Sequence, residues 1–138
     1  MTAKEELGQL YRLRESIDCL IERRRQTFDL AYKITSCNNG MPKGSGGDKV
    51  SNAAVILADL AAEIDEKTGE YERLQREIGQ KIARMENRDY RLLLELRYLN
   101  FNPWHIIAWK MNYSEKHIFY LHRNALKKYS ELEKVNTK

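Results

Sequence analysis

The chain has 138 residues, the length of one domain or of a small domain with an extension. Its 24 Lys and Arg and 20 Asp and Glu give a net charge of +4. The composition, with 32% charged and 42% apolar residues, fits a folded, charge-rich helical protein and excludes a disordered chain. No apolar run approaches the ~20 residues of a membrane helix, and the first residues lack the apolar core of a secretory signal, so we expect a cytoplasmic protein with no membrane segment.

Residues 1–86 are predicted to form a long antiparallel helical hairpin, a coiled coil. Residues 3–36 and 49–101 contain no Pro and are rich in residues that favour helix, whereas four of the seven glycines lie within residues 40–47. We therefore expect a flexible loop over residues 37–49 between two long helices. Cys19 and Cys37 would be ~27 Å apart if they lay on one helix, so both are expected to be reduced thiols.

Both predicted helices carry apolar residues at helical spacing. In the second helix the apolar residues recur every seven positions, which is typical of a coiled-coil seam: Leu57, Ile64, Tyr71, Ile78 and Met85, with Leu60 and Leu74 between them. Lys67 and Lys81 occupy the remaining seam positions. The first helix repeats in steps of three and four: Leu10, Leu13, Ile17, Leu20, Ile21, Phe28, Ala31 and Ile34. The hairpin is the candidate element for forming a homodimer.

Residues 87–132 are predicted to form a separate module of three helices. Asn87 is a candidate N-cap for a helix from Arg88 to Leu99, and Asn102 followed by Pro103 resembles the start of a short helix over 103–111. Asn112 tolerates the left-handed conformation that closes a helix, and Ser114 is expected to cap a last helix that runs to Leu132. Three helices with a short turn before the last one are a helix-turn-helix pattern. Residues 133–138 are expected to be a disordered tail.

The helix-turn-helix pattern defines an inward and an outward face. Trp104, Ile107, Ala108 and Met111, then Ile118, Leu121 and Ala125, are expected to face the core, with Leu126 or Tyr129 as further core candidates and Tyr113 filling the turn. Ile106 and Trp109 should point away from it, either into an interface or against the hairpin. Residues 87–138 hold 10 basic and 5 acidic residues, which favours phosphate binding. The candidate nucleic-acid-binding residues are Glu115, Lys116, His117, Phe119, Tyr120, Arg123, Asn124 and Lys127.

Three segments of the module carry a family resemblance: Arg91-Leu-Leu-Leu-Glu-Leu-Arg-Tyr98, Trp104-x-x-Ile-Ala-x-x-Met-x-Tyr-Ser114, and Ala125-Leu126. They resemble region four of sigma-70-class transcription factors. With the Met41-Pro42 loop and the long helices before it, the chain is similar to phage and prophage late transcription regulators of the RinA and ArpU type. The resemblance implies double-stranded DNA as partner and RNA polymerase as a second candidate. Sigma factors usually place Arg and Gln at the positions that Phe119 and Tyr120 occupy in this chain. The two aromatic side chains cannot make bidentate contacts with bases, but they could touch thymine methyl groups.

The sequence offers no basis for catalysis or for a cofactor. His105, His117 and His122 do not form a metal-binding pattern, and no Walker loop, nucleophile elbow or dinucleotide fingerprint is present. The expected function is therefore that of a non-enzymatic, sequence-specific DNA-binding transcription regulator. Two alternatives stay open: a protein-interaction module that binds RNA polymerase or another regulator without reading DNA, and a phage DNA-packaging subunit, which also combines helix-turn-helix and coiled coil.

Overall fold

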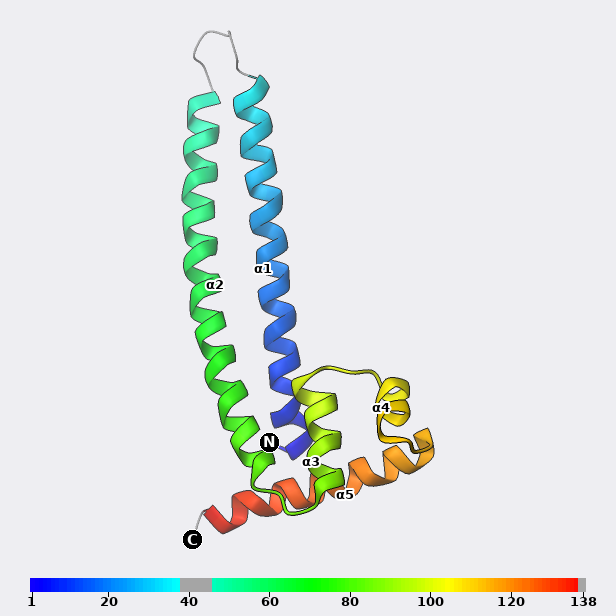
Figure 1. The fold of residues 1–138 in the computed structure, drawn as a ribbon. Coiled ribbons are helices and arrows are strands. Elements are labelled where there is room, and N and C mark those ends of the chain that lie inside the picture. The colour runs from blue at the N-terminus through cyan, green and yellow to red at the C-terminus, as the bar shows by residue number, and fades with distance from the viewer. Residues whose placement is uncertain (38–45, 137–138) are drawn as a thin grey trace. The chain divides into compact units, whose positions relative to one another are not determined.

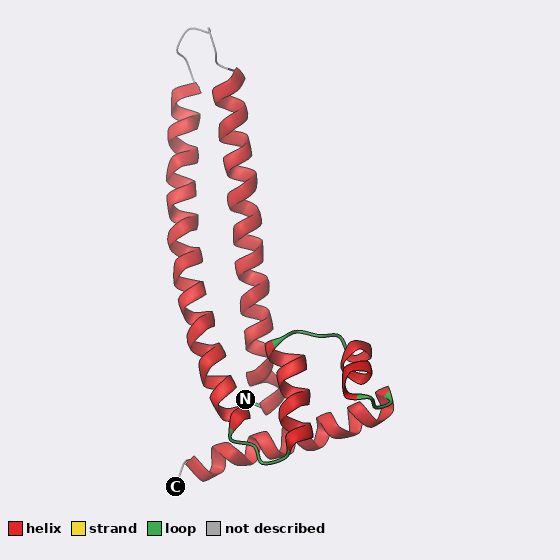
Figure 2. Ribbon diagram, viewed as in Figure 1, coloured by secondary structure: helices red, strands yellow, loops and turns green. Residues whose placement is uncertain are grey.

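The computed structural model describes the backbone of residues 1–37 and 46–136 and the side chains of residues 1–33 and 49–132. Every regular element in these residues is helical, which confirms the all-α prediction (Figure 2). The elements are α1 (Ala3–Cys37), α2 (Gly46–Ala83), α3 (Arg88–Leu94), the π-helical turn η1 (Glu95–Leu99), α4 (Trp104–Met111) and α5 (Glu115–Asn136). Within the described residues no helix combines the length and apolar character that a membrane crossing needs.

The ends of two elements differ from the expected ones. The predicted loop at 37–49 is shorter, because α1 includes Cys37 and α2 begins at Gly46, and residues 38–45 lie outside the described residues. The predicted tail at 133–138 is partly helical, because α5 continues to Asn136; residues 137–138 lie outside the described residues.

The chain packs as two compact units, each described by itself. Unit 1 comprises Met1–Leu13 and Tyr71–Lys138, and unit 2 comprises Arg14–Glu70. This grouping differs from the expected division between residues 86 and 87. The reason is that Leu7 and Leu10 of α1 and Ile78 and Ile82 of α2 belong to the same hydrophobic core as α3, α4 and α5.

Unit 2 consists of two helical segments that run antiparallel (Figure 1). Its buried cluster is small and contains Leu20, Leu60 and Ile64, so the seam predicted for α2 does face the partner helix here. The expected stripe on α1 is only partly covered, because Ile21 is 40% and Phe28 61% exposed. A helix pair that buries few large side chains leaves apolar surface for another partner.

Unit 1 contains the main core. Each α-helix of the unit contributes fully buried side chains to it: Leu7, Leu10, Ile78, Ile82, Leu93, Leu94, Ile107, Ile118, Ala125 and Tyr129. The short turn η1 adds Leu96 and Tyr98, which are nearly buried. Lys81, which interrupts the predicted seam, donates from Nζ to Glu6 Oε1 at 2.8 Å. The Tyr129 hydroxyl donates to the same oxygen at 3.3 Å, so this half-buried carboxylate joins α1, α2 and α5.

The predicted helix over residues 88–99 is present and its start is the expected one. Asn87 Oδ1 accepts hydrogen bonds from the backbone N–H groups of Asp89 at 2.9 Å and Tyr90 at 3.2 Å, as an N-cap residue does. Its last five residues form the π turn η1, and Phe101 then adopts a positive φ of 58°. Such a backbone conformation is strained for a bulky residue and is held by the surrounding structure.

The start of α4 is one residue later than predicted. Pro103, and not Asn102, is the N-cap, since its carbonyl accepts the first helical hydrogen bonds, from Ile106 N and Ile107 N, both at 3.1 Å. Asn102 serves the preceding turn instead: its backbone N and its Nδ2 both donate to the Leu96 carbonyl, at 2.9 and 3.1 Å.

Candidate nucleic-acid interface

The turn between α4 and α5 is built by three residues, Asn112 to Ser114. Asn112 adopts the left-handed conformation (φ 61°, ψ 41°), as predicted, and its N–H donates to the Trp109 carbonyl at 3.3 Å. Tyr113 N donates to the Ala108 carbonyl at 3.0 Å, which completes a Schellman motif. Ser114 Oγ accepts from His117 N at 3.1 Å and caps α5 as expected. Local hydrogen bonds therefore fix the helix-turn-helix geometry.

The predicted inward face of this turn motif is confirmed. Ile107 and Ala108 of α4 and Ile118, Leu121, Ala125 and Tyr129 of α5 are buried, and Trp104, Met111 and Leu126 are half-buried. Tyr113 departs from the prediction that it fills the turn, because it is 39% exposed. Its hydroxyl donates to Asp89 Oδ2 at 2.9 Å, and this bond together with the carboxylate charge raises the pKa of Tyr113. The contact joins the turn to the first residues of α3.

The structure places seven of the eight predicted site residues on the exposed surface of α5. These are Glu115, Lys116, His117, Phe119, Tyr120, Arg123 and Lys127, while Asn124 is half-buried. The helical repeat places Lys116, Tyr120, Arg123 and Lys127 in one row opposite the buried face. Three cations around one tyrosine are chemically suited to phosphate contacts.

The aromatic side chains at the start of α5 are exposed but not isolated. Phe119 is 45% and Tyr120 57% exposed, as their register predicted. The Phe119 ring meets the Trp104 ring edge-on, with centroids 5.3 Å apart and planes inclined by 69°. The His117 ring lies between Tyr113 and Tyr120, with centroid distances of 4.6 and 6.1 Å. These contacts hold the exposed rings in defined orientations, which lowers the entropy cost of binding a partner.

Tyr98 and His122, which were not among the predicted site residues, contact each other next to Trp104. The Tyr98 oxygen and His122 Nε2 are 2.6 Å apart, and the His122 ring meets Trp104 edge-on at a centroid distance of 4.7 Å. Burial, and to a smaller extent the charges of Lys4 and Arg97, lower the pKa of His122 to about 4. His122 is four residues after Ile118, so it shares the inward face of α5, and this spacing could have identified it as a neutral structural residue.

Trp109 is the most exposed aromatic residue of the module. It points away from the core as predicted and is 79% exposed, so no part of the described chain covers it. Ile106, predicted to share its orientation, is half-buried. A tryptophan this exposed is a candidate contact for a macromolecular partner.

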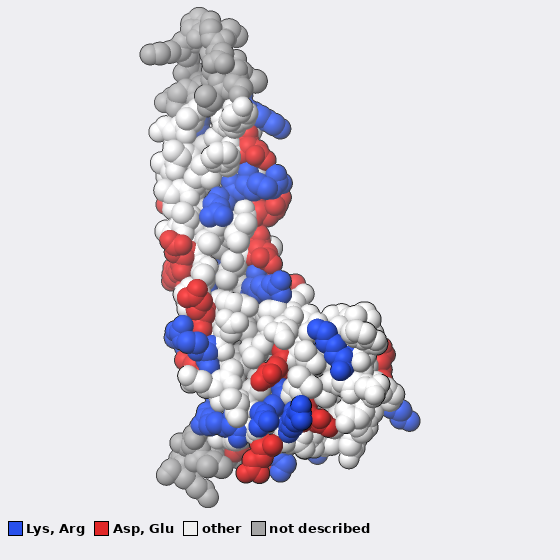
Figure 3. Space-filling model, viewed as in Figure 1, with Lys and Arg blue, Asp and Glu red and all other residues white. Residues whose placement is uncertain are grey.

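The charges on unit 1 are mixed on the face that Figure 3 shows. Lys and Arg alternate there with Asp and Glu over most of the unit, while the region of α4 carries few charged side chains. Among the described residues, no group of three or more His, Cys, Asp or Glu side chains is placed to hold a metal ion. The surface therefore offers rings and scattered cations to a partner.

The comparisons with known proteins identify a family. No curated protein and no solved structure matches the chain significantly. The sequence profile of the family described as "Protein of unknown function (DUF1492)" matches residues 33–130, which include the last residues of α1, all of α2 and nearly all of the helix-turn-helix module. The chain belongs to the DUF1492 family.

Proposed function

We propose that this protein is a sequence-specific, double-stranded-DNA-binding transcription regulator of phage or prophage genes that acts in the cytoplasm. The observation that carries the proposal is the exposed row Lys116, Tyr120, Arg123 and Lys127 on α5, directly after a three-residue turn of helix-turn-helix type. The helix would enter the major groove with its first residues toward the base edges and its later cations toward the phosphates. The resemblance to sigma region four and to RinA- and ArpU-type regulators supports the same function.

Phe119 is the proposed base-reading residue of this helix. It is exposed and its ring contacts Trp104, so it could present an oriented apolar surface to a thymine methyl group. The hairpin would provide a homodimer interface, since unit 2 leaves Ile21 and Phe28 exposed. RNA polymerase is the second proposed partner.

The first experiment tests phosphate binding through the salt dependence of affinity. The chain is titrated with fragments of the genome that carries its gene, and the double variant R123A/K127A is compared with the wild type. If each residue contacts one phosphate, the slope of log affinity against log salt should fall in magnitude by about 1.8. The control R24A/K49A removes two exposed cations of unit 2 and should keep the wild-type slope. An R123A/K127A slope equal to that of the control would contradict the proposed face.

The second experiment tests base reading by Phe119. Each thymine of the bound site is replaced in turn by uracil, which lacks only the methyl group. At one position the substitution should weaken the binding free energy of the wild type by roughly 1 kcal/mol or more. The variant F119A should have lost that sensitivity at the same position. Since F119A also loses the edge contact with Trp104, we expect it to be about 1–2 kcal/mol less stable, and its folding is checked by circular dichroism. Equal uracil sensitivity in both proteins would exclude base reading by Phe119.

Exposed Trp109 favours a second candidate function, a protein-interaction module that binds RNA polymerase or another regulator. In that case W109A would weaken capture of purified polymerase, while R123A/K127A would not. The same pair of variants therefore separates the two functions.

A further inference from the structure

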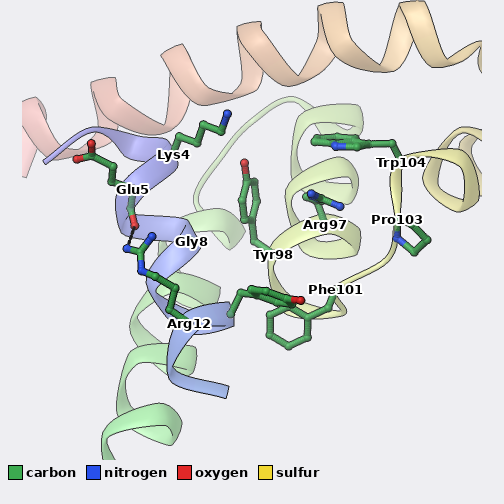
Figure 4. A pocket seen from close by; sticks show the side chains of 10 residues that line it. Lys4, Glu5, Gly8, Arg12, Arg97, Tyr98, Phe101, Pro103 and Trp104 are labelled. Atoms are coloured by element: carbon green, nitrogen blue, oxygen red, sulfur yellow. Dashed lines mark hydrogen bonds between the residues drawn. The ribbon is translucent and has the colours of Figure 1, made fainter. Parts of the chain in front are cut away.

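A pocket of about 600 Å³ lies in unit 1 between the first turns of α1 and the segment from η1 to the start of α4 (Figure 4). Its volume lies in the range of sites for small molecules. Both walls belong to unit 1, because the contributing residues fall within 4–12 and 97–104. The pocket is separate from the exposed row of α5 to which we assign DNA binding.

The pocket carries an excess of positive charge. Lys4, Arg12 and Arg97 line it, and within the described residues none of the three forms an ion pair with a carboxylate. The acidic lining residue, Glu5, is already engaged, since its Oε2 accepts from Thr2 N at 3.0 Å in a capping box. Arg12 Nη2 donates only to the main-chain oxygen of Glu5, at 3.3 Å. An anion entering the pocket would therefore meet three cations and one carboxylate, that of Glu5, which is held by Thr2 N.

Aromatic rings form the rest of the wall. Tyr11 and Phe101 lie with ring centroids 5.7 Å apart, and Tyr98 and Trp104 line the same space (Figure 4). The Arg97 guanidinium lies 4.3 Å from the Trp104 ring centroid, and its Nη1 donates to the Asn102 carbonyl at 3.1 Å, so the cation is oriented beside an aromatic face. The strained Phe101 backbone places one of these rings, as strain at binding sites often does.

Gly8 keeps the pocket open on the side of α1. A glycine in a helix costs roughly 1 kcal/mol relative to alanine, so the sequence gives up some helix stability here. A Cβ at this position would approach only Arg12 Nη1, at 3.7 Å, which is ordinary contact. The backbone thus has room for a side chain that would project into the pocket.

We propose that this pocket binds a small anion of the nucleoside-phosphate class, which joins a planar base to a phosphate, and that its occupancy regulates the DNA-binding surface. The rings would stack on the base and the three cations would bind the phosphate. Inorganic phosphate would contact only the cations, and a neutral nucleoside would contact only the rings. The regulatory part rests on the proposed function. Trp104 couples the two sites, because it lines the pocket and also contacts Phe119 and His122 of α5, at 5.3 and 4.7 Å between ring centroids.

The test uses adenosine monophosphate as probe and the full chain carrying W109F, so that Trp104 is the sole tryptophan and its fluorescence reports the pocket. We expect saturable binding of the nucleotide that is roughly tenfold or more tighter than binding of adenosine or of inorganic phosphate. Arg97→Gln and Lys4→Gln should each weaken it by a similar factor. Lys110→Gln, an exposed cation of α4 outside the pocket, should not.

Gly8→Leu provides a variant that blocks the pocket without weakening the helix. It should abolish nucleotide binding while the protein stays folded by circular dichroism. Nucleotide binding by folded Gly8→Leu, or equal binding of adenosine and the nucleotide, would overturn the site. These titrations contain no DNA, so their failure is distinct from failure of the proposed function. DNA affinity is then measured with and without saturating nucleotide, and equal affinities would overturn the regulatory part alone.

Discussion

The substitution Leu10→Ala tests whether the first turns of α1 belong to the same cooperative unit as the helix-turn-helix. Leu10 is fully buried in the core that also contains α3, α4 and α5 residues. The change removes three buried carbon groups, each worth about 0.8 kcal/mol of transfer free energy. Incomplete collapse of the cavity adds about 1–2 kcal/mol. We therefore expect a loss of about 3–4 kcal/mol in the free energy of unfolding of unit 1.

The two tryptophans provide an assay specific for this unit. Trp104 and Trp109 both lie on α4, so tryptophan fluorescence follows unit 1, while far-ultraviolet circular dichroism follows all helices. With a denaturant slope of about 2 kcal/mol per molar urea, the fluorescence midpoint of Leu10→Ala should fall by roughly 1.5–2 M.

Leu20→Ala is the matched control, because Leu20 is nearly buried but belongs to the small cluster of unit 2. It should shift the circular dichroism curve and leave the fluorescence midpoint close to that of the wild type. A fluorescence midpoint that is unchanged by Leu10→Ala, or that both substitutions lower equally, would refute the assignment of the α1 N-terminus to unit 1.

Two further predictions follow from half-buried polar groups of unit 1. The pKa of His122 is lowered from 6.5 to about 4, so the unfolded chain binds more protons than the native chain between these pH values. The stability contributed by neutral His122 is thus complete above pH 6.5 and is lost as the pH falls toward 4. The pKa shift corresponds to at most about 3 kcal/mol in the free energy of unfolding. Because His122 is partly exposed, we expect a loss of about 1–2 kcal/mol. Urea titrations between pH 7 and pH 4 should show a shallower fall for His122→Phe than for the wild type, and parallel curves would contradict the prediction. For the Glu6–Lys81 pair, Glu6→Gln and Lys81→Met should each cost about 1–3 kcal/mol in the free energy of unfolding. The double variant should cost less than the sum, because either single change already removes the same half-buried ion pair. Additive losses would exclude a coupling between the two residues.

The local structure of the C-terminal module was predictable because its signals are local. Asn87, Asn112 and Ser114 act through hydrogen bonds to backbone groups within five residues, and the inward residues of α4 and α5 follow from helical periodicity. The exposure of Phe119 and Tyr120 followed from the same register. The start of α4 was misplaced because Asn102 binds Leu96 O, a partner in the preceding turn that helix-start patterns do not reveal.

The sequence by itself determined the all-α class, the turn chemistry and the residues exposed on α5, since periodicity and capping depend only on neighbours along the chain. Only the tertiary structure decided that Leu7 and Leu10 join the core of α3 to α5, that Lys81 on the seam pairs with Glu6, and that His122 lies half-buried beside Tyr98. It also decided the cationic aromatic pocket, whose two walls are separated by more than 80 residues of chain. Contacts across such separations depend on how whole helices pack, and a single helical register specifies which face is apolar but not what will cover it.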